Sequence, residues 1–210
     1  MAKRLFDLVF SALALLVLAP LLLCVALWVT LDSPGGAFFR QTRVGRAGKP
    51  FRIYKFRTMC ADAEASGPAI TAQADARITR AGHWLRRTKL DELPQFLNVL
   101  IGDMSIVGPR PEVPQYVDLY PAAVRSIVLS VRPGITDAAS IEFRNESHIL
   151  GQSSDPERIY VEQILPIKLQ HAVHYAGHHS LWGDLKIIAR TVAALWHNSP
   201  QEGMAQKDGT

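Results

Sequence analysis

The chain has 210 residues, enough for one domain with a real hydrophobic core. Its net charge of +4 and its pI of about 9.2 suit anionic partners without selecting one class of them. Its only two cysteines, Cys24 and Cys60, exclude a disulfide framework and give no sign of an oxidising compartment.

An uncharged apolar segment extends from Leu8 to Leu31 near the N-terminus. It exceeds the roughly 18 apolar residues that indicate a membrane helix. A cleaved signal peptide is disfavoured, because its apolar part usually has only about 7–15 residues and no small-residue cleavage site follows here. A single membrane-spanning anchor is the main alternative interpretation of this segment.

Basic residues flank this apolar segment on both sides. Lys3 and Arg4 precede it, and residues 40–57 contain seven basic residues and no acid. Positive charge favours the cytoplasmic side of a membrane, and Pro20 in the middle of the segment favours a kink. A helix bent at Pro20 can enter and leave the membrane on one face. The flanks and the proline leave this re-entrant arrangement and a spanning one both open.

The segment "AFFRQTRVGRAGKPFRIYKFRTM" predicts a β-hairpin, because two stretches rich in aromatic and β-branched residues flank Gly45 and Gly48. Its charge is uniformly positive, which fits a surface that rests on anionic lipid headgroups. Lys55 and Arg57 add a second interpretation, a phosphate site. The two interpretations are compatible, since a membrane enzyme that handles phosphates needs both.

Two adjacent acids stand out in "RRTKLDELPQFLNVLIGDMSIVGPRP". A helix is predicted over 81–90, before the pair. Asp91 is a good N-cap for a second helix, and Pro94 then falls in its first turn, where a missing N–H costs little. The dipole of this helix is expected to keep Asp91 and Glu92 ionised. The predicted core-facing positions of the second helix are Leu93, Phe96, Leu97 and Leu100.

The chemistry of such a pair depends on its surroundings. An isolated Asp-Glu at a helix start is most often a cap and a first-turn acid. Paired carboxylates can also hold Mg²⁺ together with phosphate oxygens, or attack phosphorus as nucleophiles. That attack brings two anions together, so it needs a metal and arginines to neutralise the substrate. The nearby basic residues, including Arg86 and Arg110, favour this second interpretation.

Five motifs occur in one order along nearly the whole chain: "KRLFD", "FFRQTRVGRAGKPFRIYKFRTM", "RRTKLDELPQFLNVLIGDMSIVGPRPE", "RPGIT" and "SLWGDLKII". With them the chain resembles the bacterial sugar transferase family, the monotopic phosphoglycosyl transferases. Because the chain starts at the KRLFD motif, it resembles the minimal catalytic form of that family, without additional N-terminal spans.

The resemblance implies a reaction and a site. A sugar 1-phosphate passes from a nucleotide diphosphate sugar, expected to be a UDP-sugar, to a polyprenol phosphate such as undecaprenyl phosphate. Nucleoside monophosphate is released in this first membrane step of glycan assembly. Asp91 is expected to form a covalent phosphosugar intermediate, Asp91 and Glu92 to hold Mg²⁺, and Pro20 to break the re-entrant helix. The expected phosphate contacts are Arg86 and Arg110, followed by Lys55, Arg57 and Arg132.

Two stretches depart from the family pattern. Many members have Ser-Pro at the helix break, whereas this chain has Ala19-Pro20, so the break depends on Pro20 alone. After "RPGIT" many members continue with Gly and an aromatic-Gln-Val segment, whereas this chain has "DAASIEFRNESHIL" from Asp137. The second departure bears on the choice of sugar and nucleotide rather than on the reaction class.

The expected architecture is therefore α+β, predominantly helical with a short β-hairpin. Residues 1–35 form the re-entrant membrane helix, residues 36–197 the cytoplasmic catalytic domain, and residues 198–210 a polar, disordered tail. The expected location is the bacterial inner membrane, with the catalytic domain on its cytoplasmic face. Membrane lipids are expected partners, and nucleic acid is not, because the basic residues adjoin a membrane segment. Two other functions stay open, a membrane-tethered scaffold with a basic lipid-binding face and a Mg²⁺-dependent phosphatase.

Overall fold

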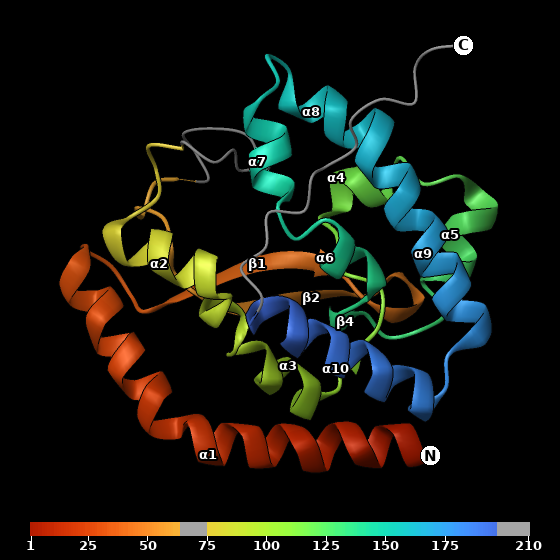
Figure 1. Cartoon of the computed structure of the whole chain (residues 1–210), viewed down its shortest axis with the longest axis horizontal. Helices are drawn as coiled ribbons and strands as arrows, with labels where there is room; N and C mark the ends of the chain where they lie inside the picture. Colours follow the sequence, from red (N-terminus) through yellow and green to blue (C-terminus); the bar gives the residue numbers. More distant parts are fainter. Residues whose placement is uncertain (64–74, 197–210) are drawn as a thin grey trace.

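The computed structural model describes residues 1–63 and 75–196, and the predicted tail lies outside these ranges (Figure 1). Helices predominate in the described part and the strands are short, as the sequence predicted. The elements are α1 Ala2–Asp32, β1 Phe38–Val44, η1 Arg46–Gly48, β2 Pro50–Phe56, α2 Arg80–Thr88, η2 Leu90–Glu92, α3 Gln95–Ile101, β3 Ser105–Val107, α4 Pro114–Val117, α5 Ala122–Val128, β4 Gly134–Thr136, α6 Ala138–Glu142, α7 Glu146–Gly151, α8 Pro156–Ile159, η3 Tyr160–Ile164, α9 Leu165–His178 and α10 Leu181–Trp196.

Helix α1 has 31 residues and, within the described ranges, is the one helix long and apolar enough to cross a membrane. Figure 1 shows it bent near its middle, with one half along the lower edge of the molecule and the other rising toward α2. Pro20 lies inside the helix, where it removes one main-chain hydrogen bond and crowds the preceding turn. The bend therefore has an identifiable cause in the sequence.

The first turns of α1 are attached to the domain by polar contacts. Asp7 is buried, and its carboxylate accepts hydrogen bonds from Ser105 Oγ at 2.8 Å and from the Ile106 amide at 3.2 Å. Arg4 donates to the Val99 carbonyl at 2.8 Å. These contacts reach β3 and the end of α3. The charged residues of "KRLFD" thus attach the apolar helix to the domain.

Lys3 makes the longest-range contact of this helix. Its ammonium donates to the Val107 carbonyl at 3.1 Å and forms an ion pair with Asp184 of α10. The same Asp184 accepts a hydrogen bond from the Tyr175 hydroxyl at 2.9 Å. Asp184 is only 1% exposed, so its charge is stabilised by Lys3 rather than by water. The "KRLFD" and "SLWGDLKII" motifs meet at this ion pair.

The second half of α1 is attached at its C-terminal end by Arg57. This guanidinium donates to the carbonyls of Ser33 at 2.8 Å, Pro34 at 2.7 Å and Gly36 at 2.7 Å. Carbonyls at a helix end and in the loop after it have no partner within the helix, and Arg57 satisfies them. Both ends of α1 are therefore held by the same domain.

The predicted hairpin is present. β1 and β2 pair antiparallel, from Phe38 opposite Phe56 to Val44 opposite Pro50. Ala47 and Gly48 take positive φ values of 58° and 74° in the connecting η1 turn. Glycine adopts this conformation without strain, which agrees with the glycine-containing loop that the sequence predicted.

A second, two-stranded sheet pairs β3 with β4 in parallel. It brings the "VGPRP" and "RPGIT" motifs together, because Gly108 directly follows β3 and Gly134 is the first residue of β4. A Cβ atom on Gly134 would lie 2.1 Å from the Gly108 nitrogen, so only glycine fits. Close backbone contact at this point fixes where the chain leaves β3 toward Arg110.

Candidate active site

Asp91 and Glu92 lie in the short η2 turn rather than at the cap of a helix. Helix α2 ends at Thr88, close to the predicted end, and Lys89 then takes a left-handed conformation with a φ of 58°. This residue turns the chain, and Pro94 rather than Asp91 occupies the N-cap of α3 without a side-chain hydrogen bond. The predicted capping role of Asp91 was therefore wrong.

Helix α3 buries polar residues as well as apolar ones, which corrects the predicted core-facing positions in part. Leu97 is exposed, whereas Gln95 and Asn98 are buried. Asn98 accepts a hydrogen bond from the Tyr54 amide at 2.8 Å and donates to the Arg52 carbonyl at 2.8 Å. The edge of β2 needs these partners, so the polar side of α3 faces the hairpin. The prediction holds for Phe96, which packs against the core cluster that contains the fully buried Val99.

Glu92 is neutralised by two cations. Its Oε1 accepts from Lys55 Nζ at 2.8 Å, and the two carboxylate oxygens accept from Arg110 at 2.5 and 3.3 Å. Burial disfavours the ionised form, but Arg110 and Lys55 outweigh burial and hold the pKa of Glu92 well below its usual range. Glu92 is thus a permanent anion at neutral pH.

Asp91 is in the opposite situation. Its side chain is 7% exposed, and among the described residues its Oδ1 has no hydrogen-bond partner. Burial raises the pKa of Asp91, and the charge on Glu92 raises it further. The sequence predicted that a helix dipole keeps both acids ionised; for Asp91 burial opposes this. Two adjacent carboxyl groups therefore differ in their affinity for a proton and in their freedom to contact a ligand.

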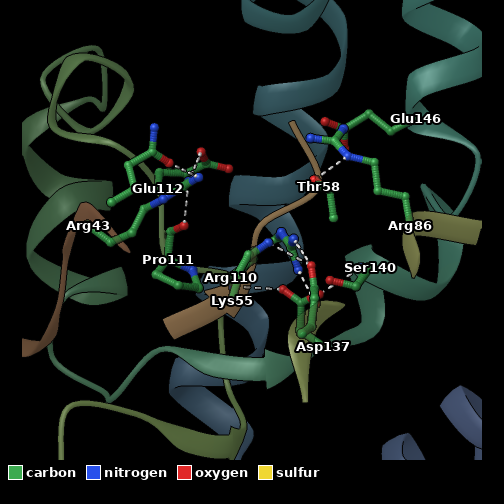
Figure 2. A network of polar contacts seen from close by, with 12 residues as sticks. Arg43, Lys55, Thr58, Arg86, Arg110, Pro111, Glu112, Asp137, Ser140 and Glu146 are labelled. Carbon is green, nitrogen blue, oxygen red and sulfur yellow. Dashed lines mark hydrogen bonds and ion pairs between the residues drawn. The ribbon is translucent and has the colours of Figure 1, made fainter. Parts of the chain in front are cut away.

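Arg86 is the cation that interacts with Asp91 from the end of α2. Its Nε donates to the Thr58 hydroxyl at 2.9 Å, which aligns the last turn of α2 with the segment after β2. Burial lowers the pKa of Arg86 and the Asp91 carboxylate partly restores it, so the two groups interact. In the view of Figure 2, Arg86 and Thr58 lie to the right of Arg110, and Arg43 lies to its left.

The loop that carries Arg110 is held at several points. The Arg110 amide donates to Asp137 Oδ2 at 3.1 Å, and Asp137 Oδ1 accepts from the Ser140 amide at 2.7 Å as the N-cap of α6. Arg43 donates to the Pro111 carbonyl at 3.0 Å (Figure 2). Arg110 is thus aimed at Glu92 by its neighbours on both sides.

Glu112, two residues further on, continues this support. It is buried, accepts a hydrogen bond from the Tyr160 hydroxyl at 2.5 Å and lies 3.7 Å from Arg43. Burial raises the pKa of Tyr160, and the Glu112 charge raises it further, so the hydroxyl remains a donor at neutral pH. The loop is therefore anchored from the η3 turn as well.

The profile of the family described as "Bacterial sugar transferase" matches residues 1–198. The chain belongs to the bacterial sugar transferase family.

Curated relatives of this chain carry specific names. The Aeromonas hydrophila protein named UDP-N-acetylgalactosamine-undecaprenyl-phosphate N-acetylgalactosaminephosphotransferase is 37% identical over 195 residues, which are 92% of this chain and 43% of that protein. Two proteins are named UDP-glucose:undecaprenyl-phosphate glucose-1-phosphate transferase. The Escherichia coli one is 40% identical over 90% of this chain and 39% of its own length. The Caulobacter vibrioides one is 41% identical over 92% and 69%, respectively. The chain thus spans less than half of the first two relatives.

The structure brings some of the predicted site residues together and separates others. Lys55, Arg86 and Arg110 surround the Asp91–Glu92 pair. Arg57 instead holds the end of α1, and Arg132 donates to the Gly102 carbonyl at 2.9 Å, at the far end of α3 from the acids. No described contact joins Arg57 or Arg132 to the pair.

Other polar residues of the site were missed in the sequence. Asp137 was interpreted only as the start of a departing segment, although it holds the Arg110 loop. The polar positions of "DELPQFLN", Asp91, Gln95 and Asn98, share one helical face at i, i+4 and i+7. That spacing could have indicated a polar face, but the prediction was based on the leucines of the opposite face.

The residues present fit a magnesium ion in part. Mg²⁺ is usually held by one or two carboxylates, several waters and substrate phosphates. Asp91 Oδ1, buried and without a partner in the described chain, fits such a ligand. Glu92 already binds Lys55 and Arg110, so it would share its carboxylate between those cations and a metal. No described group of three His, Cys, Asp or Glu side chains forms a separate metal site.

Proposed function

We propose that this protein transfers a sugar 1-phosphate from a UDP-sugar to undecaprenyl phosphate in the membrane. Membership of the bacterial sugar transferase family and the activities in the names of its relatives support this reaction. The observation that carries the proposal is Asp91, a buried carboxylate with an unpartnered oxygen, beside an acid that two cations neutralise. The arrangement leaves one Asp91 oxygen available for a reaction, whereas Glu92 is held in ion pairs with Lys55 and Arg110.

The proposed reaction has two steps. In the first, an Asp91 oxygen attacks the sugar-bearing phosphorus, and the bond to the bridging oxygen breaks. That oxygen keeps the electron pair and leaves with uridine monophosphate. In the second, a phosphate oxygen of the lipid attacks the same phosphorus, the bond to Asp91 breaks, and the free carboxylate is restored. Lipid diphosphate sugar is the product.

Arginines and a lysine make the first attack feasible, because both reactants are anions. Arg86 interacts electrostatically with Asp91, so it is proposed to bind an oxygen of the phosphate that Asp91 attacks. Arg110 can exchange part of its contact with Glu92 for a contact with a phosphate, since a guanidinium can donate two parallel hydrogen bonds to either a carboxylate or a phosphate. Asp91 and Glu92 would hold Mg²⁺, which supplies neutralisation of the diphosphate when bound.

We also propose that α1 is re-entrant and that the domain lies on the cytoplasmic face of the bacterial inner membrane. A straight helix of 31 residues would separate its ends by about 45 Å. Here the helix is bent, its first turns bind β3, and Arg57 holds its last turn to the same domain. Basic residues on both flanks favour the cytoplasmic side.

The decisive test uses the full-length protein in nanodiscs with undecaprenyl phosphate and a panel that includes UDP-glucose and UDP-N-acetylgalactosamine. With at least one donor, we expect that steady-state release of uridine monophosphate requires undecaprenyl phosphate. A phosphatase would need no lipid acceptor, and a scaffold would release nothing.

The covalent step is tested by quenching the enzyme with donor alone and measuring the mass of the peptide that contains Asp91. A phosphosugar adduct is expected there, formed in step with uridine monophosphate. Asp91→Asn should remain folded and lose turnover by orders of magnitude, as expected when a covalent route is removed. If turnover requires both substrates at once and no adduct forms, direct transfer replaces this mechanism.

A further inference from the structure

Gln95 carries a buried amide nitrogen without a partner in the described part of the chain. Its side chain is 1% exposed, and its Nε2 has no hydrogen-bond partner among the described residues. A buried donor without a partner is destabilising, and native proteins contain few of them. A methionine or leucine would fill the same space without this cost, so the amide calls for a role outside the fold.

Asn98, on the same face, makes the contrast clear. Both ends of its amide bond to the main chain of β2, at the Tyr54 amide and the Arg52 carbonyl. Asn98 therefore holds α3 against the hairpin. The Nε2 of Gln95 contributes nothing comparable to that attachment, although it lies one turn closer to the acids.

The position of Gln95 points to the neighbouring acid. Asp91 and Gln95 are four residues apart in the continuous segment formed by η2 and the start of α3, and both side chains are buried. Asp91 Oδ1 is likewise buried without a partner, and the two groups are not bonded to each other. One acceptor and one donor, both buried and unpaired, therefore lie four residues apart in one short segment.

We propose that Gln95 is a further catalytic residue, whose Nε2 donates a hydrogen bond to a non-bridging oxygen of the phosphate that Asp91 attacks. This inference rests on the proposed function. Negative charge resides on the equatorial oxygens during phosphoryl transfer, and a fixed donor in a dry site stabilises it. An amide also adds no charge, so it leaves the balance between Lys55, Arg110 and the two acids unchanged.

The test is Gln95→Met in the full-length enzyme, because methionine has similar length and no donor. The value of kcat/KM for uridine monophosphate release should fall about 100-fold, as for the loss of one transition-state donor. The fall should appear mainly in kcat, since the contact strengthens as charge develops. The thermal midpoint should stay equal or rise, because an unsatisfied buried group has been removed.

Gln170→Met, at an exposed position of α9, is the matched control and should leave both quantities unchanged. A normal rate for Gln95→Met, or a rate loss that only follows a lowered thermal midpoint, would make Gln95 a packing residue and overturn the inference. Wild-type enzyme without activity toward any donor would overturn the proposed function, and this inference with it. Active wild type with an unaffected Gln95→Met overturns the inference alone.

Discussion

Arg110 and Glu92 form a two-pronged ion pair, with 2.5 Å between Nη2 and Oε1 and 3.3 Å between Nη1 and Oε2. Lys55 reaches the same Oε1 at 2.8 Å. The pair is largely buried, so its charges depend on each other more than on water. Removing the acid leaves two cations without a partner.

Glu92→Gln should therefore destabilise the protein, by about 3 kcal/mol at pH 7, as typical for breaking a buried ion pair. The folded pKa of Glu92 lies well below its ordinary value of 4.5. The stability it contributes is thus fully present above that value and is lost as the pH falls through the folded pKa. Thermal unfolding from pH 7 to pH 3 should show the difference from wild type shrinking below about pH 4.5. Glu162→Gln, at an exposed pair, should show no such dependence. A difference that grows toward acid would contradict this linkage.

The pH dependence of the first reaction step should report Asp91. Burial and the Glu92 charge raise the pKa of Asp91 above its ordinary value of 3.8, and only the carboxylate attacks phosphorus. The rate of uridine monophosphate release should rise with pH through this raised pKa. In Glu92→Gln the rise should occur at lower pH, because one neighbouring negative charge is gone. An unchanged midpoint would mean that another group controls the step.

Gly134→Ala should prevent stable folding. The added Cβ would lie 2.1 Å from the Gly108 nitrogen, and both atoms belong to rigid backbone. We expect a loss of more than about 4 kcal/mol, measured by thermal unfolding and by protease sensitivity in detergent. Gly36→Ala, where a Cβ meets nothing within 4 Å, is the matched control and should behave as wild type. A folded Gly134→Ala protein would show that the β3–β4 contact can relax.

The Lys3–Asp184 ion pair can be measured with a double-mutant cycle. Lys3→Met should be strongly destabilising, because it leaves Asp184 buried and charged without its cation. Combining it with Asp184→Asn should recover part of the loss, with a coupling energy of about 1–3 kcal/mol. Lys186→Met, at an exposed position of α10, controls for the loss of a lysine on that helix. Additive effects of the two substitutions would indicate that the contact contributes no stability.

Pro20→Ala should straighten α1 and favour a membrane-spanning arrangement. In the wild type, single cysteines placed before Leu8 and after Leu31 should both be protected from an impermeant reagent added outside the cell. In Pro20→Ala a fraction of one flank should become labelled. Because Cys24 and Cys60 are native thiols, both are replaced with serine first. Labelling of one wild-type flank from outside would exclude the re-entrant arrangement.

Local patterns predicted the elements better than they predicted the faces of those elements. The hairpin was predictable because aromatic residues, β-branched residues and turn glycines act within a few positions. The buried side of α3 was not, since it depends on the Asn98 contacts with a strand more than 40 residues earlier. Leucine spacing indicates which residues share a face, but it does not say whether that face is buried or exposed.

The site was predictable to the same extent. Asp91, Glu92, Arg86 and Arg110 lie within one motif, so the short sequence distance brought them to attention. Arg57 matched the phosphate prediction equally well by charge alone, but the end of α1 satisfies it. Asp137 looked like a departure from a pattern, and its bond to the Arg110 amide appears only when β3 and β4 pair.

The contact between Lys3 and Asp184 also bears on the order of events during biosynthesis. The ribosome makes α1 before α10, so the apolar helix is complete well before α10 exists. Lys3 then has no acidic partner until 181 more residues have been added. Asp7 likewise waits for Ser105 and Ile106. Arg57 can hold the end of α1 much earlier, so the helix is attached to the domain in stages, and the Lys3–Asp184 ion pair is among the last of its contacts that the nascent chain can make.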